Sequence, residues 1–282
     1  MKFQTIRRRW VRKQLPKRAE DAHKGNFGRI LLLCGSLGYT GAAYLAAMGA
    51  LRSGAGLVYL GVPESIYAIE AIKLNEAIVF PLPESEGKLC EAALPEIRSR
   101  MKSMDAVLIG PGLGRSEGVA MVVRTVLQEF AGPVVVDADG INAIAAHMDI
   151  VRERRYPTVF TPHPGEFATM GGDLTSGRPD AAKRMAADFG IVLVLKGHKT
   201  VVTDGETVYV NPTGNPGMAV GGSGDVLAGM IVSLIGQGIV PLTAAACASN
   251  LHGLAGDVCE KKLGQYGMLP SDLLGELPRL MK

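Results

Sequence analysis

The chain has 282 residues, of which 47% are hydrophobic and 20% charged, enough apolar material for one sizeable core and too much for a disordered or collagen-like protein. The formal net charge is +3, but residues 1–18 carry eight positive charges and no acidic residue, so the rest of the chain carries −5. Because neither a recognition helix nor an aromatic stacking motif accompanies these charges, the sequence predicts no nucleic-acid partner. We expect a basic N-terminal arm (1–22), solvated or in contact with another subunit, followed by a single domain (23–282).

Three further features concern membranes and compartments. No apolar segment follows the basic arm, so the arm does not resemble an export signal. Two charge-free stretches, 30–51 and 226–256, are long enough to span a membrane, yet polar turns interrupt both, which favours buried elements and predicts no membrane partner. The cysteines lie far apart, without metal-ligand spacing, which is typical of free buried thiols in a reducing cytoplasm. They are Cys34, Cys90, Cys247 and Cys259.

From residue 29 onward, short apolar runs alternate with glycine-rich turns and helical patterns, as in a parallel sheet with helical crossovers. The pattern predicts a strand over 29–34, a glycine-rich loop over 35–41 and a helix over 42–52. Further strands are predicted over 57–61, 77–80, 106–109, 133–137, 158–160 and 191–195. Their almost continuous apolar character indicates a sheet that helices cover on both faces.

The last third of the chain predicts a change in strand direction. Residues 200–210 form two alternating β-branched runs around the tight-turn pair Asp204-Gly205, which predicts a hairpin. Long helical patterns follow over 223–235 and 242–261. The predicted fold class is therefore α/β, with three layers (α/β/α), a mostly parallel central sheet and an antiparallel edge hairpin.

Ligands bind open α/β sheets at the carboxyl ends of the strands, and five loops at such positions have unusual compositions. These loops are 35–41, 110–114, 137–140, 161–166 and 215–225. In the last, three glycines allow close backbone approach and precede a helix start, a combination that attracts phosphate. Asp225 follows, placed to accept a proton from an attacking hydroxyl, although a carboxylate here also stabilises a helix start.

Two common phosphate-binding motifs are missing from the sequence. No G-x-x-x-x-G-K-[ST] segment occurs, which excludes a P-loop nucleoside triphosphatase. The loop G-S-L-G-Y-T-G at 35–41 does not match G-x-G-x-x-G, so dinucleotide binding of the Rossmann type has no support.

Five motifs in order resemble one enzyme family. They are GPGLGR at 110–115, VVVDADGINA at 134–143, TPHPGE at 161–166, KGHKTVV at 196–202 and NPGMAVGGSGDVLAG at 215–229. The last is similar to the anion-hole and catalytic-base motif of ribokinase-like enzymes. Together, from about residue 21 to near the C-terminus, they resemble the ADP- or ATP-dependent NAD(P)H-hydrate dehydratases. The resemblance is to the stand-alone bacterial form, because fewer than 25 residues precede the first matching segment and the epimerase domain of some relatives would not fit there.

The resemblance implies an enzyme of metabolite repair, a lyase that restores NADH or NADPH from the S-epimer of its hydrate. It transfers a phosphoryl group to the ring hydroxyl and then eliminates phosphate. Asp225 would be the base, and Gly222, Ser223 and Gly224 would form the anion hole. Ala42, Gly114 and His163 would line the hydrated nucleotide together with Asp225.

The family also implies a site for the phosphoryl donor, which is ADP or ATP with Mg²⁺. Residues expected to bind the nucleotide are Lys196, Gly197, His198, Lys199, Thr200 and Gly224. Glu166 would contact Mg²⁺ through water, since this ion retains several waters. The resemblance further implies a cytoplasmic homotetramer, whereas the choice between ADP and ATP, and between NADH and NADPH hydrates, stays open.

Departures from the family pattern leave alternatives. Cys34 stands where a glycine is frequent, and Val220 where a small or hydroxylated residue is frequent. A small-molecule kinase of the same superfamily, acting on a vitamin precursor, is the alternative enzyme; such kinases carry T-P-N-x-x-E, so His163 in place of asparagine favours the dehydratase. A nucleotide-binding regulator or RNA-associated protein that retains the fold and uses the basic arm is a third hypothesis.

Overall fold

The computed structural model describes residues 3–282, and its centre is one large sheet. Its strands are β1 (Gln4–Thr5), β2 (Arg29–Leu33), β3 (Leu57–Pro63), β4 (Ile78–Leu82), β7 (Ala106–Ile109), β8 (Val134–Val136), β9 (Thr158–Phe160), β10 (Val192–Leu195), β11 (Val201–Thr203) and β12 (Val208–Val210). They are ordered β1-β12-β11-β10-β9-β8-β7-β2-β3-β4, and only β11 runs antiparallel to its neighbours. A small separate hairpin pairs β5 (Glu84–Ser85) with β6 (Lys88–Leu89).

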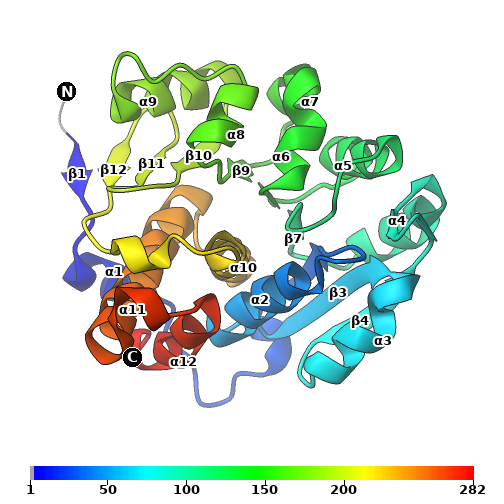
Figure 1. The fold of residues 1–282 in the computed structure, drawn as a ribbon, viewed down its shortest axis with the longest axis horizontal. Helices are drawn as coiled ribbons and strands as arrows, with labels where there is room; N and C mark the ends of the chain where they lie inside the picture. The colour runs from blue at the N-terminus through cyan, green and yellow to red at the C-terminus, as the bar shows by residue number, and fades with distance from the viewer. Residues whose placement is uncertain (1–2) are drawn as a thin grey trace.

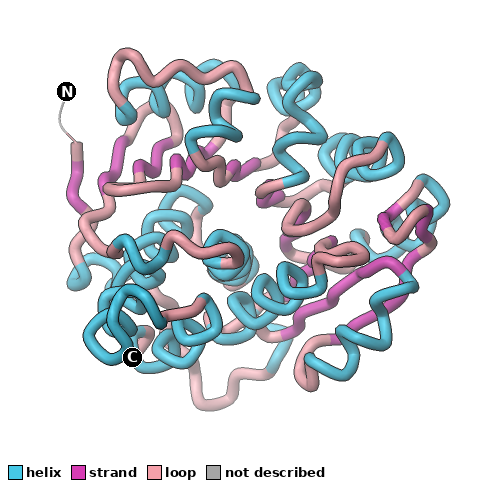
Figure 2. Tube along the Cα trace, in the orientation of Figure 1, coloured by secondary structure: helices cyan, strands magenta, loops and turns pink. Residues whose placement is uncertain are grey.

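Helices cover both faces of this sheet (Figures 1 and 2). One face carries α1 (Arg8–Gln14), α2 (Thr40–Arg52), α3 (Glu64–Lys73), α10 (Ser223–Gly236), α11 (Pro241–Gly267) and α12 (Pro270–Leu280). The other carries α4 (Leu94–Met101), α5 (Glu117–Glu129), α6 (Asp139–Ile144), α7 (Met148–Glu153), α8 (Pro164–Thr169) and α9 (Arg178–Phe189). Short 3₁₀ turns occur at Lys24–Phe27, Glu91–Ala93, Ala145–His147 and Pro216–Met218.

The apolar strands supply two cores, one on each side of the sheet. In β2, Ile30 and Leu32 belong to one core and Leu31 and Leu33 to the other, because successive side chains of a strand point to opposite faces. All four are fully buried. A strand between two helical layers therefore has no polar face, which is why its sequence is continuously apolar.

The predicted three-layer fold is confirmed. The seven predicted parallel strands match β2, β3, β4 and β7 to β10 within two residues at either end. The helices predicted over 42–52 and 223–235 correspond to α2 and α10, and the third, 242–261, lies within the longer α11. The predicted hairpin is β11–β12, although the sheet continues for one more strand because β1 pairs with β12.

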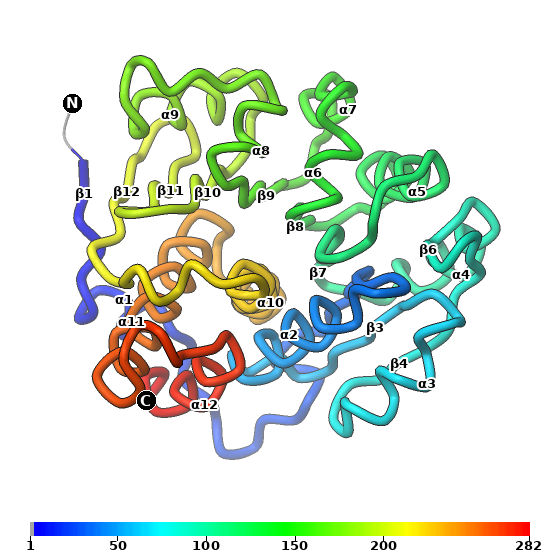
Figure 3. Tube along the Cα trace, viewed as in Figure 1, coloured from blue at the N-terminus to red at the C-terminus, as the bar shows by residue number. Residues whose placement is uncertain are grey.

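The basic arm packs on the domain through its apolar residues, which the expectation of an arm either solvated or in contact with another subunit did not include. Ile6 is 2% exposed and Val11 is fully buried, and the Trp10 ring lies 5.3 Å from that of Tyr209 on β12. The arm runs along β12 and then beside α11 (Figure 3). Its described basic side chains are all exposed, as expected, because the apolar residues alternate with them on the inward side. The division into an arm (1–22) and a domain (23–282) stays a prediction.

Helices α2 and α10 approach each other closely and bring their N-terminal ends to the same edge of the sheet. A Cβ atom at Gly229 on α10 would lie 2.1 Å from the carbonyl oxygen of Ala46. At Gly49 on α2, it would lie 2.5 Å from that of Val226. Glycine at both positions therefore permits a helix contact that any side chain would separate.

The two charge-free stretches and all four cysteines lie within residues 3–282. No helix in this range is both long and apolar enough to cross a membrane. The four cysteines are free; Cys34, Cys247 and Cys259 are buried, as predicted, and Cys90 is partly exposed.

Candidate active site at the carboxyl ends of the strands

The loops that follow β2, β7, β8, β9 and β10 contact one another at one edge of the sheet. Three hydrogen bonds of 2.8 Å link them: Gly35 N–H to Pro111 O, Gly114 N–H to Asp139 Oδ2, and Lys196 N–H to Pro162 O. The N-terminus of α10 joins the same group, because a Cβ atom at Gly224 would lie 3.2 Å from Lys196 Nζ. All five loops selected from the sequence thus meet at one place.

The start of α10 has the geometry of an anion-binding site. Gly222 precedes the helix with φ 97° and ψ −18°, a left-handed conformation that favours glycine, and a Cβ there would lie 2.4 Å from Leu45. Among the described residues no side chain caps this helix. The amide groups of its first turn therefore remain available to an anion, and the helix dipole favours negative charge at the same point.

Asp225 lies in this first turn and is partly buried. Burial, followed by the negative charge of Asp137, raises the pKa of Asp225 to about 7, while the Lys196 ammonium lowers it. A carboxylate with a pKa near neutrality is ionised in part at physiological pH and still has substantial proton affinity. Asp225 is thus suited to act as a general base.

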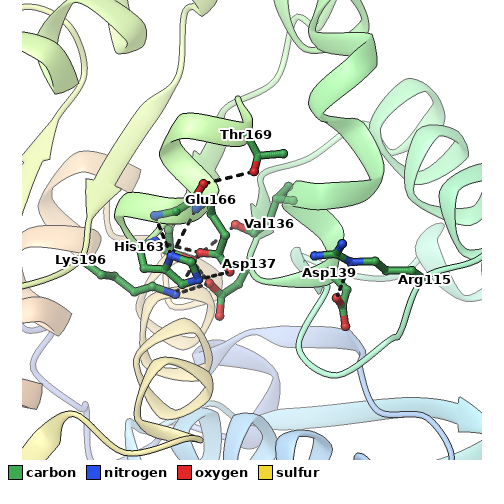
Figure 4. A network of polar contacts seen from close by, with 10 residues as sticks. Arg115, Val136, Asp137, Asp139, His163, Glu166, Thr169 and Lys196 are labelled. Atoms are coloured by element: carbon green, nitrogen blue, oxygen red, sulfur yellow. Dashed lines mark hydrogen bonds and ion pairs between the residues drawn. The ribbon is translucent and has the colours of Figure 1, made fainter. Parts of the chain in front are cut away.

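Next to Asp225, an acidic and basic cluster joins three strand ends (Figure 4). Asp137, after β8, is 1% exposed, and its Oδ1 accepts hydrogen bonds from Thr161 Oγ1 and Lys196 Nζ, each at 2.7 Å. Lys196 Nζ also lies 3.8 Å from Glu166 Oε2. Although burial alone would lower the pKa of Lys196, the charges of Asp137 and Glu166 raise it, so Lys196 is a cation beside the anion-binding helix start.

His163 is the N-cap of α8. Its Nδ1 accepts hydrogen bonds from the amides of Gly165 (3.0 Å) and Glu166 (3.2 Å), and Glu166 Oε2 accepts from the His163 amide at 2.8 Å. This reciprocal arrangement is a capping box. Asparagine is also a good N-cap, which explains physically how both residues fit the same motif. The His163 side chain is 57% exposed, and its Nε2 lies 3.3 Å from Glu166 Oε1.

Ala42 and Gly114, the other predicted substrate contacts, lie on the opposite side of the group of loops. A Cβ at Gly112 would lie 2.8 Å from the Cβ of Ala42, which places the first turn of α2 against the loop after β7. Gly114 is held by its amide, which donates to Asp139. Both residues are half-buried and offer backbone and shape only.

The predicted nucleotide segment, 196–200, forms an exposed turn with a fixed base. Arg178 donates to the carbonyls of Leu195 (2.8 Å) and Lys196 (2.9 Å), and Thr200 Oγ1 donates to Gly197 O at 3.0 Å. Residues 197–199 are exposed. The turn therefore presents its backbone to solvent next to the α10 start, where a nucleotide could lie along it.

Several residues of this site were not among the sequence predictions. Asp137 and Asp139 lie in a selected loop, but two residues apart on a chain do not show whether they face the same side. Arg178 comes from α9, far from any motif. His252 on α11 has its Nε2 3.4 Å from Ser223 Oγ, and burial lowers its pKa to about 4, so it is neutral. No sequence signal indicated these last two contacts.

The charge balance of the site suits a nucleotide that carries a divalent cation. Four carboxylates lie in this site, those of Asp137, Asp139, Glu166 and Asp225. The ammonium of Lys196 interacts with three of them, and Arg115 Nε lies 4.0 Å from Oδ1 of the fourth, Asp139. Phosphates without a counter-ion would meet excess negative charge here. In residues 3–282 no three acidic, histidine or cysteine side chains form a ready metal site, and both Glu166 oxygens already have partners. A contact of Glu166 with Mg²⁺ would therefore pass through water.

Comparison with known proteins decides the family. The family model described as NAD(P)H-hydrate dehydratase matches residues 30–279. The chain belongs to the NAD(P)H-hydrate dehydratase family. It is 37% identical over 278 residues to the ADP-dependent (S)-NAD(P)H-hydrate dehydratase of Bacillus subtilis, covering 96% of this chain and 95% of that protein. This confirms the resemblance found in the sequence.

Other relatives are longer. The chain is 44% identical over 280 residues to the bifunctional NAD(P)H-hydrate repair enzyme Nnr of Moorella thermoacetica, covering 97% of this chain but 53% of that protein. The chain thus spans about half the length of the bifunctional members of the family that it matches.

Solved structures confirm the ribokinase-like fold. The ADP/ATP-dependent NAD(P)H-hydrate dehydratase of Bacillus subtilis, co-crystallised with ATP and Mg²⁺, superposes with a TM-score of 0.84 at 32% identity. The match covers 99% of this chain and 98% of that one.

Proposed function

We propose that this chain catalyses ADP- or ATP-dependent dehydration of the S-epimer of hydrated NADH and NADPH. The observation that carries the proposal is the position of Asp225: a partly buried carboxylate at an uncapped helix start, inside a chain that is similar over nearly its whole length to a dehydratase of that activity. The kinase alternative shares the fold and the base; it differs in the acceptor hydroxyl and in ending at the phosphate ester, without elimination of phosphate.

In the proposed reaction Asp225 accepts the proton of the ring hydroxyl while that oxygen forms a bond to the terminal phosphorus of the nucleotide. The bond from this phosphorus to its bridging oxygen breaks, which releases AMP from ADP, or ADP from ATP. The amides of Gly222, Ser223 and Gly224 stabilise the charge on the phosphoryl oxygens. The carbon–oxygen bond then breaks, phosphate leaves and the ring double bond is restored with loss of a proton.

The remaining predicted residues have positioning roles in this proposal. Ala42, Gly114 and His163 would lie along the hydrated nicotinamide nucleotide, and the turn 196–200 along the donor nucleotide. Mg²⁺, when bound with the donor, would neutralise phosphate charge, with Glu166 in contact through water. Lys196 adds a fixed positive charge from the protein side.

The oligomeric state of the protein and its location in the cell are also proposals. We infer a cytoplasmic homotetramer, supported by the free thiols and by exposed apolar side chains on α3 and β4 that a subunit contact would cover: Tyr67, Ile69, Ile72 and Ile78. Light scattering of the purified chain tests the assembly, and a monomeric mass would contradict it.

The test of function is an assay with hydrated NADH, Mg²⁺ and either ADP or ATP, which follows the return of reduced-nicotinamide absorbance. We expect recovery that depends on a nucleotide and is absent for Asp225→Asn. The preferred nucleotide identifies the donor. If the folded protein binds adenine nucleotide yet restores no absorbance, the dehydratase proposal is wrong and hydroxylated vitamin precursors become the substrates to screen.

A further inference from the structure

Only one of the two oxygens of the Asp137 carboxylate has hydrogen-bond partners among the described residues. Its Oδ1 accepts hydrogen bonds from Thr161 and Lys196, whereas its Oδ2 is buried and has no hydrogen-bond partner among the described residues. A buried carboxylate oxygen without a partner costs free energy, because the water that would solvate its charge is missing. Because buried polar atoms are usually hydrogen-bonded, an unpaired oxygen in a site of this kind indicates a functional role.

This oxygen faces the helix start that carries Asp225. A Cβ atom at Gly224 would lie 3.8 Å from Asp137 Oδ2 and 3.2 Å from Lys196 Nζ, so the negative and the positive charge both lie against the first turn of α10. The Asp137 and Lys196 side chains point toward each other from the ends of β8 and β10, which flank β9 in the sheet (Figure 4). Lys196 is bonded to Oδ1, which leaves the charge of Oδ2 directed at the helix.

We propose that Asp137 is a positioning residue of this site, which holds the Lys196 ammonium at the start of α10 through Oδ1 and keeps Asp225 basic through the charge of Oδ2. This inference rests on the proposed function, in which Asp225 removes the proton. A negative charge close to a carboxylate favours its protonated form, whereas an ammonium favours its ionised form. Asp137 and Lys196 therefore act on Asp225 in opposite directions from one ion pair.

Other charged groups around Asp225 affect its pKa less than Asp137 and Lys196 do. Asp139 on α6 and Glu166 on α8 also raise the pKa of Asp225, but Asp137 is the largest charged influence after burial. Two further groups near it are neutral: His252 on α11, with a lowered pKa of about 4, and Cys34 after β2, whose pKa burial raises. Without Asp137, the attraction of Lys196 would be less opposed and Asp225 would lose proton affinity.

The test is a carbon-13 NMR titration of the aspartate carboxyl groups in the full-length protein without nucleotide. The Asp225 signal is identified by its loss in Asp225→Asn. In Asp137→Asn we expect its midpoint to move to lower pH by about half a unit or more, and in Lys196→Met to move to higher pH by a similar amount. Asp139→Asn is the matched control, with a smaller downward shift. A purely structural role would not move the midpoint in opposite directions in the two variants.

The titration does not depend on dehydratase activity, so it separates this inference from the proposed function. If the wild-type enzyme restores no NADH but the midpoints shift as expected, the function is wrong and the role of Asp137 holds. If the enzyme is active, the acidic limb of its kcat/KM profile should move with the NMR midpoint in each variant.

An unchanged Asp225 midpoint in folded Asp137→Asn overturns the inference, whatever the activity. Should Asp137→Asn fail to fold, Asp137→Ser takes its place: a midpoint at lower pH supports the inference and an unchanged one overturns it.

Discussion

Asp225 meets two requirements that oppose each other. Burial raises its proton affinity, which a general base needs, and at the same time makes its ionised form costly in the folded state. The folded-state pKa of about 7 exceeds the ordinary value of 3.8, so the folded protein binds this proton more tightly than the unfolded chain. Stability is therefore unaffected below pH 4, falls as the pH rises toward 7, and stays reduced above it.

Asp225→Asn is expected to remove activity and add stability. The amide cannot accept the proton, so the rate should fall by roughly 100-fold or more. Because the uncharged amide escapes the cost of burial, the free energy of unfolding at pH 8 should rise by roughly 2 kcal/mol, with no gain at pH 4. Steady-state rates and urea unfolding at both pH values measure this. An active variant, or an equal gain at both pH values, would contradict the role given to Asp225.

At the element scale, the position of helix α10 matters most, because its first turn carries both the proposed base and the amides proposed to bind the anion. Its close contact with α2, through Gly229 and Gly49, sets this position. A side chain at either glycine would meet backbone, which cannot rotate away as a side-chain end can. The helix pair thus links the core directly to the geometry of the site.

Gly229→Ala should destabilise the protein by about 1–3 kcal/mol, since a methyl group would overlap the Ala46 carbonyl. The matched control is Gly275→Ala in α12, where nothing lies within 4 Å of the new Cβ and better helix propensity should stabilise by up to about 1 kcal/mol. Thermal unfolding of the two variants should give shifts of opposite sign. Equal shifts would show that the α2–α10 contact does not limit packing.

The N-terminal arm extends the fold at the scale of the whole molecule. β1 adds a parallel strand beyond the hairpin, and α1 packs against α11, so the arm closes one end of the sheet. Ile6 and Val11 contribute to the core while the basic side chains face outward. The arm therefore stabilises the domain independently of any partner for its charges.

Removal of residues 1–14 should lower the free energy of unfolding by roughly 3 kcal/mol, because the deletion loses the burial of two large apolar side chains, those of Ile6 and Val11. Arg8→Gln together with Arg9→Gln is the control, and should change stability by less than about 0.5 kcal/mol because both side chains are exposed. Differential scanning calorimetry measures both. A truncated protein as stable as the full chain would show that the arm contributes no packing energy.

The sequence was sufficient to predict seven parallel strands, the hairpin, the helices α2 and α10, and the five loops that meet at the candidate site. Strand β2 could be found because both its faces are buried, which leaves an unbroken apolar run, and the 215–225 loop because its glycines and Asp225 adjoin in the chain. The family followed from five motifs in order. Each of these features is formed by residues that are adjacent in the chain, so it can be recognised from periodicity and composition.

Contacts between distant segments were decided by tertiary structure alone. The 2.7 Å bond between Lys196 and Asp137 spans 59 positions, and the Ser223–His252 contact joins two helices. The burial of Val11 beneath exposed basic side chains could not be predicted either, because a single buried residue in a charged segment creates no hydrophobic periodicity. Proton affinity depends on burial and on charges brought together in space, so the sequence by itself indicated Asp225 as the candidate base, and only the fold decided how strongly this carboxylate holds a proton.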